Sequence, residues 1–122
     1  MPTTIHLVRH GHHALLGRIL CGRMPGVNLD EQGRAAMAAC AEKIAPPPSL
    51  IQSSPQPRAL QSADILADHF RLKVDVAPEV DEIDVGDWTG RRFDELEHDP
   101  AWRHWNAHRG SGVPPGGESM QA

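Results

Sequence analysis

The chain has 122 residues, a length that suits one domain, and a net charge of −4. Hydrophobic residues make up 39% and charged residues 23% of the sequence, an ordinary soluble balance. The negative charge disfavours a nucleic-acid partner, and no apolar run approaches the roughly 20 residues that cross a bilayer. Cys21 and Cys40 show no metal-site spacing, and the N-terminus lacks the pattern of a secretory signal. We therefore expect a cytoplasmic protein with reduced thiols.

The first expected elements are a strand and a helix. Residues 4–8 (TIHLV) form a short apolar run that predicts a buried strand. This strand would end at Arg9-His10-Gly11, and ligands of open α/β sheets bind at the C-terminal ends of strands. Asp30 is then expected to cap a helix that runs to about Ile44, because a run of three prolines follows.

A second strand and helix are expected next along the chain. Residues 49–52 (SLIQ) predict the strand, and Ser53-Ser54-Pro55 offers an N-cap hydroxyl and an early helical proline. Apolar residues at helical spacing extend this helix to Phe70. Alternating apolar residues over 72–76 predict a third strand.

The C-terminal third predicts shorter elements. Residues 80–90 are expected to form an ordered loop, and residues 93–108 short helices that break near Pro100. A turn region rich in glycine and proline is expected over 110–117.

Three clusters of residues have side chains suited to phosphoryl transfer. They are Arg9-His10-Gly11, SSPQPRALQSA at 53–63 and EIDVGDWTG at 82–90. A phosphoryl group in transfer needs its oxygens held by fixed positive charge, and the planar guanidinium group binds two oxygens at once.

Each catalytic role has a candidate residue in these clusters. Arg9 and Arg58 are the candidates for binding phosphate, and neutral His10 can accept the phosphoryl group. A carboxylic acid must protonate the leaving oxygen, and we expect Glu82 in this role with Asp84 as the reserve.

The clusters together resemble the histidine phosphatase superfamily, the phosphoglycerate-mutase-like group. The resemblance rests on segments that follow one another in the family's order: LVRHG at 7–11, GRMPGVNLDEQG at 22–33, SSPQPRALQSA at 53–63, EIDVGDWTG at 82–90 and PPGGES at 114–119. It implies an α/β fold, a three-layer α/β/α sandwich with a mainly parallel sheet.

The resemblance also implies an activity. This is metal-independent hydrolysis of a small phosphomonoester through a phosphohistidine on His10, without a cofactor. Within the family the chain is similar to phosphatases of the α-ribazole phosphatase type. Mutases usually carry Arg-His-Tyr where this chain has Ile83-Asp84-Val85.

Two departures from the family pattern affect these expectations. His12 and His13 stand where the family usually has Glu or Gln followed by Thr or Ser, and His10-Gly11 is the only His-Gly pair, whereas the family has a second. We therefore expect residues 1–122 to be a single domain that is incomplete at its C-terminus. We also expect the chain alone to be inactive or impaired, with an uncovered sheet edge through which it could self-associate.

Three alternatives stay open. The protein could be a mutase that returns the phosphoryl group to its substrate. It could also be a non-catalytic phosphate- or phosphopeptide-binding module. His10, His12 and His13 could form half a metal site, although no Asp-His or Glu partner follows at metallo-hydrolase spacing.

Overall fold

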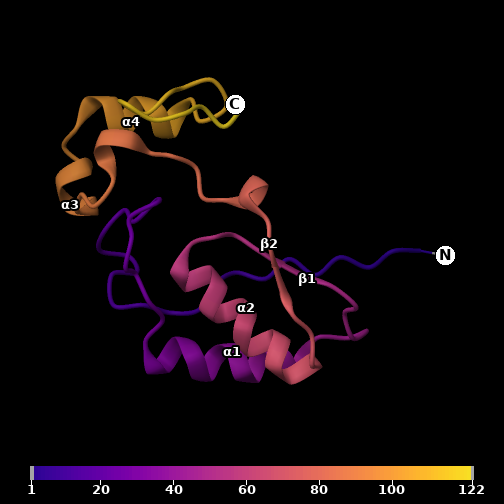
Figure 1. Cartoon of the computed structure of the whole chain (residues 1–122). Helices are drawn as coiled ribbons and strands as arrows, with labels where there is room; N and C mark the ends of the chain where they lie inside the picture. Colours follow the sequence, from indigo (N-terminus) through magenta and orange to yellow (C-terminus); the bar gives the residue numbers. More distant parts are fainter. Residues whose placement is uncertain (1, 122) are drawn as a thin grey trace. The chain divides into compact units, whose positions relative to one another are not determined.

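The computed structural model describes residues 2–121 of the chain (Figure 1). These residues form two compact units, each built from two separate stretches of chain. The first unit joins Met1–Ala14 to Gly26–Asp81, and the second joins Leu15–Pro25 to Glu82–Ala122. The expectation of a single domain over residues 1–122 stays a prediction.

The first unit is a small α/β assembly. Its elements are α1 (Glu31–Lys43), β1 (Ile51–Ser53), α2 (Pro57–Phe70), β2 (Val74–Val76) and the 3₁₀ helix η1 (Pro78–Val80). Strands β1 and β2 pair in parallel, and α2 connects them and packs against both, while α1 packs against α2. The core between them contains Leu29, Met37, Ala41 and Leu66. The α/β class with a parallel sheet is therefore confirmed.

Helix α1 begins where the sequence predicts it. The side chain of Asp30 accepts a hydrogen bond from the backbone N–H of Gly33, so Asp30 is the N-cap. The helix ends at Lys43, shortly before the three prolines, as expected. The predicted second and third strands are also present, and their ends lie within two residues of those expected.

The predicted buried strand over residues 4–8 is wrong. These residues have no regular secondary structure, and the side chains of Ile5 and Leu7 are 77% and 94% exposed. A strand is stable only when its N–H and C=O groups pair with a neighbouring strand. Among residues 2–121, the only sheet is formed by β1 and β2, so residues 4–8 have no strand partner there.

The predicted start of α2 is also wrong. The helix begins at Pro57 with Gln56 as N-cap, three residues after Ser54. Ser53 belongs to β1, and the hydroxyl of Ser54 instead accepts from the N–H of Gln56 in the turn. The strand thus continues through the position that the sequence assigned to the cap, and Pro57 rather than Pro55 is the first helical residue.

The second unit packs around three tryptophans. It contains η2 (Gly86–Trp88), α3 (Phe93–Leu96) and α4 (Pro100–Ala107). Trp88, Trp102 and Trp105 are buried together. The rings of Trp88 and Trp102 pack edge to face, with their centroids 5.3 Å apart. The expected break between short helices occurs at Asp99, which caps α4. None of the helices within residues 2–121 is long and apolar enough to span a membrane.

Candidate active site

The segment that carries His10 is attached to α2 by a buried hydroxyl group. The backbone N–H of Gly11 donates to Oγ of Ser62 at 3.0 Å, and this hydroxyl donates to the carbonyl oxygen of Arg58 at 2.8 Å. Ser62 is one helical turn after Arg58, so the same turn of α2 presents both residues. His10 and Arg58 are therefore held in one neighbourhood of the first unit without a strand beneath His10.

The same segment is attached to the start of α1. The backbone N–H of Asp30 donates to the carbonyl oxygen of His12 at 3.1 Å, and Nδ1 of His12 lies 2.5 Å from Oδ2 of Asp30. A Cβ atom on Gly33 would lie only 2.2 Å from that same His12 oxygen. Glycine at this position allows the segment to pass directly over the first turn of α1.

The contacts of the His10 ring determine which nitrogen can react. Nδ1 of His10 lies 2.8 Å from the carbonyl oxygen of Gly11, which can only accept, so we assign the proton to Nδ1. The lone pair of the neutral ring is then on Nε2. The side chain is half-buried, so solvent still reaches part of it.

A second histidine and an arginine are buried beside His10. His13 and Arg58 are each only 3% exposed, and the rings of His10 and His13 lie 5.4 Å apart. Burial lowers the pKa of His13, and the charge of the Arg58 guanidinium group, together with that of His10 whenever its ring is protonated, lowers it further. The neutral form of His13 is thus favoured in a site that already holds a guanidinium group.

The two arginines predicted to bind phosphate differ in their surroundings. Arg58 is buried in the first turns of α2, where backbone N–H groups also favour an anion. Arg9 is exposed. The hydrogen bonds of Ser62 link the segment of His10 to the turn of Arg58, whereas Arg9 lies exposed next to His10 in the chain.

Glu82, the predicted proton donor, belongs to the second unit and is exposed. Its Oε1 accepts from the N–H of Ile83 at 3.0 Å, and its carbonyl oxygen accepts from Nε of Arg23 at 2.6 Å. Asp84, the reserve candidate, stabilises the local backbone turn, because its Oδ1 accepts a hydrogen bond from the N–H of Gly86 at 2.9 Å.

The sequence did not assign roles to several residues that shape these sites. Ser62 stands inside the quoted motif, one turn after Arg58, and that spacing was the available signal. His13 was noted as a departure from the family pattern and as part of a possible half metal site, without a role beside His10. Arg23 stands inside the quoted segment 22–33, but no local spacing indicated its contacts, because its partners are far along the chain.

The structure also bears on metals and thiols. Within residues 2–121, no group of three or more His, Cys, Asp or Glu side chains is arranged to hold a metal ion. Neither Cys21 nor Cys40 forms a disulfide bond within residues 2–121.

Sequence comparison establishes the family. The sequence model of the histidine phosphatase superfamily (branch 1) matches residues 5–122. An uncharacterised protein of Mycobacterium tuberculosis is 34% identical over 120 residues, a match that covers 95% of this chain and 58% of that relative. The chain belongs to the histidine phosphatase superfamily. It spans less than two thirds of the length of this curated relative.

Solved structures of phosphatases share the fold. Mycobacterial glucosyl-3-phosphoglycerate phosphatase is 31% identical with a TM-score of 0.78, over 90% of this chain and 53% of that one. The α-ribazole phosphatase of Shigella flexneri has a TM-score of 0.80 at 23% identity, over 93% of this chain and 58% of that one. The mycobacterial enzyme has also been solved with inorganic phosphate, and that chain is 29% identical with a TM-score of 0.77, over 90% of this chain and 52% of that one.

Proposed function

We propose that this chain carries the phosphoryl-accepting site of a phosphomonoester phosphatase, with His10 as the nucleophile. The observation that carries the proposal is the arrangement around Ser62. Its hydroxyl group links the segment of His10 to the turn of α2 that presents the buried Arg58. Phosphoryl transfer depends mainly on position and on fixed positive charge, and this arrangement supplies both.

The proposed reaction has two steps. Nε2 of His10 attacks phosphorus, the P–N bond forms, and the ester P–O bond breaks while Glu82 gives its proton to the leaving oxygen. Glu82 then takes a proton from water, whose oxygen attacks phosphorus, and the P–N bond breaks to release inorganic phosphate. Arg9 and Arg58 bind the phosphoryl oxygens, and no metal or cofactor takes part.

The substrate we propose is a small phosphorylated molecule. Support comes from the relatives, because both named enzymes are phosphatases and one has been solved with inorganic phosphate. We also propose a cytoplasmic location, since reducing compartments keep cysteines such as Cys21 and Cys40 out of disulfide bonds.

The first test of the proposal is a labelling experiment. The natural protein incubated with a labelled phosphodonor should acquire an acid-labile label on His10. Label that persists in His10→Ala would remove His10 as the acceptor. Release of inorganic phosphate separates a phosphatase from a mutase, and binding without turnover would identify a phosphate-binding module.

A second test addresses the proton donor. Glu82→Gln should lower turnover by roughly 10²–10⁴-fold, the usual range for a positioned acid. The loss should shrink for aryl phosphates, whose leaving groups need little protonation. The matched control is Asp84→Asn, and a larger loss in this variant than in Glu82→Gln would reverse the assignment.

A further inference from the structure

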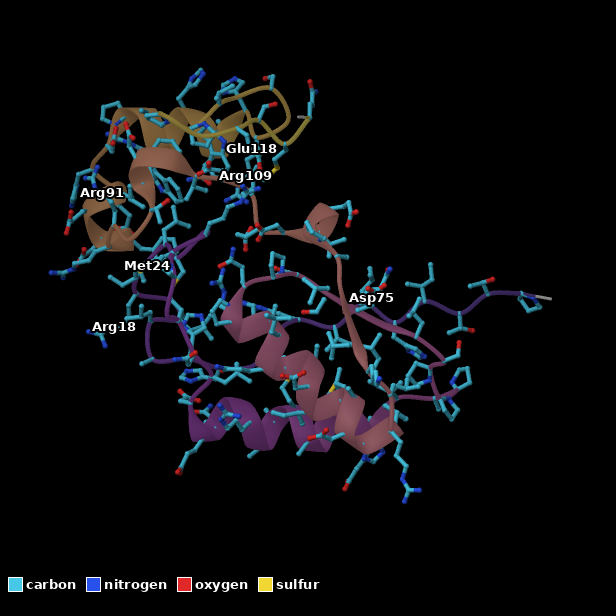
Figure 2. The ribbon with its side chains drawn as sticks, in the orientation of Figure 1. Arg18, Met24, Asp75, Arg91, Arg109 and Glu118 are labelled. Carbon is cyan, nitrogen blue, oxygen red and sulfur yellow. The ribbon has the colours of Figure 1, made fainter. Side chains whose placement is uncertain are left out.

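Arg23 connects three segments of the second unit that are far apart in the sequence. Its Nε donates to the carbonyl oxygen of Glu82 at 2.6 Å, and its Nη2 donates to Oε1 of Glu118 at 3.0 Å. One guanidinium group thus contacts both the segment of the proposed acid and the segment 114–119, whose residue Glu118 is labelled in Figure 2. The planar group directs its donors in fixed directions, so it restricts how the two segments can lie.

Glu118 makes the second half of the connection. The same Oε1 atom that accepts from Arg23 also accepts from the N–H of Asp84 at 3.1 Å. In return, the N–H of Glu118 donates to the carbonyl oxygen of Asp84 at 2.9 Å. The residues on both sides of Ile83 are therefore held, Glu82 by Arg23 and Asp84 by Glu118.

Two glycines permit this close approach. A Cβ atom on Gly117 would lie 2.3 Å from the carbonyl oxygen of Asp84, and one on Gly86 would lie 2.2 Å from that of Pro115. Backbone groups cannot yield as flexible side chains do, so both positions require glycine. The segment 114–118 is thereby held against residues 84–87, where Asp87 N–H donates to Pro115 O at 2.7 Å.

The contacts of Arg23 contribute little to stability. The side chains of Arg23 and Glu118 are 41% and 39% exposed, and ion pairs at such exposure are weak because water competes for both partners. These contacts matter more for the position of Glu82 than for stability. A proton donor must lie within hydrogen-bond reach of the leaving oxygen, so its backbone must be held in place.

We propose that Arg23, together with Glu118, is a positioning residue for Glu82. The inference rests on the proposed function, since Glu82 matters to turnover only if it supplies the proton. Arg23 acts through the backbone of Glu82 and touches neither the substrate nor the transferred phosphoryl group. The carboxylate of Glu118 balances the charge of Arg23 and keeps its guanidinium group in place.

The test measures turnover of two phosphomonoesters by the natural protein, an alkyl phosphate with a poor leaving group and an aryl phosphate with a good one. Arg23→Gln should lower kcat for the alkyl ester by about 10–10²-fold, the order of loss caused by a small misplacement, with little change in KM. The loss for the aryl ester should be much smaller. Glu118→Ala should behave similarly, and Glu118→Gln should be milder because its amide oxygen still accepts.

The chain offers a matched control in Arg91→Gln. Arg91 is also 41% exposed and pairs with Glu95 in the same unit, at a position separate from Glu118 in Figure 2. This variant should leave both rates unchanged. In a Glu82→Gln background, Arg23→Gln should cause no further loss, because the group it positions is already absent.

The outcomes separate the two proposals. A loss that is equal for both esters, or that adds fully to that of Glu82→Gln, would overturn the role of Arg23 while leaving Glu82 as the acid. If Glu82→Gln shows no dependence on the leaving group, the proposed acid and the positioning role fail together. On the 122-residue chain itself, Arg23→Gln should speed amide hydrogen exchange at Ile83 and Asp84, and unchanged exchange would also overturn the inference.

Discussion

Nδ1 of His12 lies 2.5 Å from Oδ2 of Asp30, while the other carboxylate oxygen of Asp30 caps helix α1 through Gly33. One carboxylate group therefore holds both the start of a helix and the segment that follows His10. The hydrogen bond from the N–H of Gly33 is the main cause that lowers the pKa of Asp30, and the hydrogen bond from His12 lowers it further.

The first prediction concerns this carboxylate and pH. A carboxyl group with a lowered pKa stabilises the folded state above its ordinary pKa, about 3.9, and this contribution is lost as pH falls through the folded-state value. Asp30→Asn keeps a good N-cap but removes the charge. The variant should therefore melt below the wild type at neutral pH, and the difference should shrink below about pH 4. A difference in thermal midpoint that is the same at both pH values would contradict this role.

The second prediction concerns the charge state of His13. Its lowered pKa means that the unfolded chain binds more protons, so stability should decrease as pH falls below about 6.5, the ordinary value of histidine. Burial disfavours its charge most, His10, Arg58 and His12 disfavour it further, and Asp30 favours it. Denaturant unfolding between pH 7 and pH 5 should show a smaller decrease for His13→Gln. NMR of the ring nitrogens that finds a raised pKa for His13 would refute the prediction.

The third prediction concerns the buried hydroxyl of Ser62. Ser62→Ala leaves the N–H of Gly11 without its acceptor, a loss that typically costs about 1–3 kcal/mol for a buried donor. Phosphohistidine formation should decrease as well, because the segment of His10 loses its contact with α2. Ser62→Thr is the matched control, since it keeps the hydroxyl group. Equal unfolding free energies for Ser62→Ala and wild type would contradict the prediction, because they would mean that Gly11 does not depend on this acceptor.

The fourth prediction compares two glycines of the second unit. Gly117→Ala places a Cβ atom 2.3 Å from a backbone oxygen, so we expect a loss of about 1–3 kcal/mol in unfolding free energy. A Cβ atom on Gly110 meets nothing within 4 Å, so Gly110→Ala should stay within about 0.5 kcal/mol of wild type. Equal effects of the two substitutions would argue against the close contact of residues 117 and 84.

The fifth prediction concerns the 122-residue chain by itself. Ile5 and Leu7 are largely exposed on a segment that has no strand partner among residues 2–121. Such apolar surface favours association, so we propose that the chain self-associates as its concentration rises and that it turns over phosphomonoesters poorly. Sedimentation velocity should show association that Ile5→Lys combined with Leu7→Lys reduces. A chain that stays monomeric at all concentrations and turns over phosphomonoesters readily would disprove it.

Much of the fold was predictable where the pattern is local. Asp30 as the cap of α1 and the helix break near Pro100 follow from residues close together in the sequence, because caps and prolines act on adjacent backbone. The motifs likewise identified the family, because they follow one another in its order along the chain. The roles of His10 and Arg58 stay predictions.

Only the tertiary structure decided which of these patterns are realised and which residues meet. Residues 4–8 have an apolar pattern typical of a strand, yet a strand also needs a neighbour, and the pattern does not encode one. His12 and His13 are adjacent, but packing buries His13 while His12 pairs with Asp30. Arg23 and Glu118 are 95 positions apart, and their contact depends on how whole segments pack, because long-range contacts leave no periodicity in the sequence.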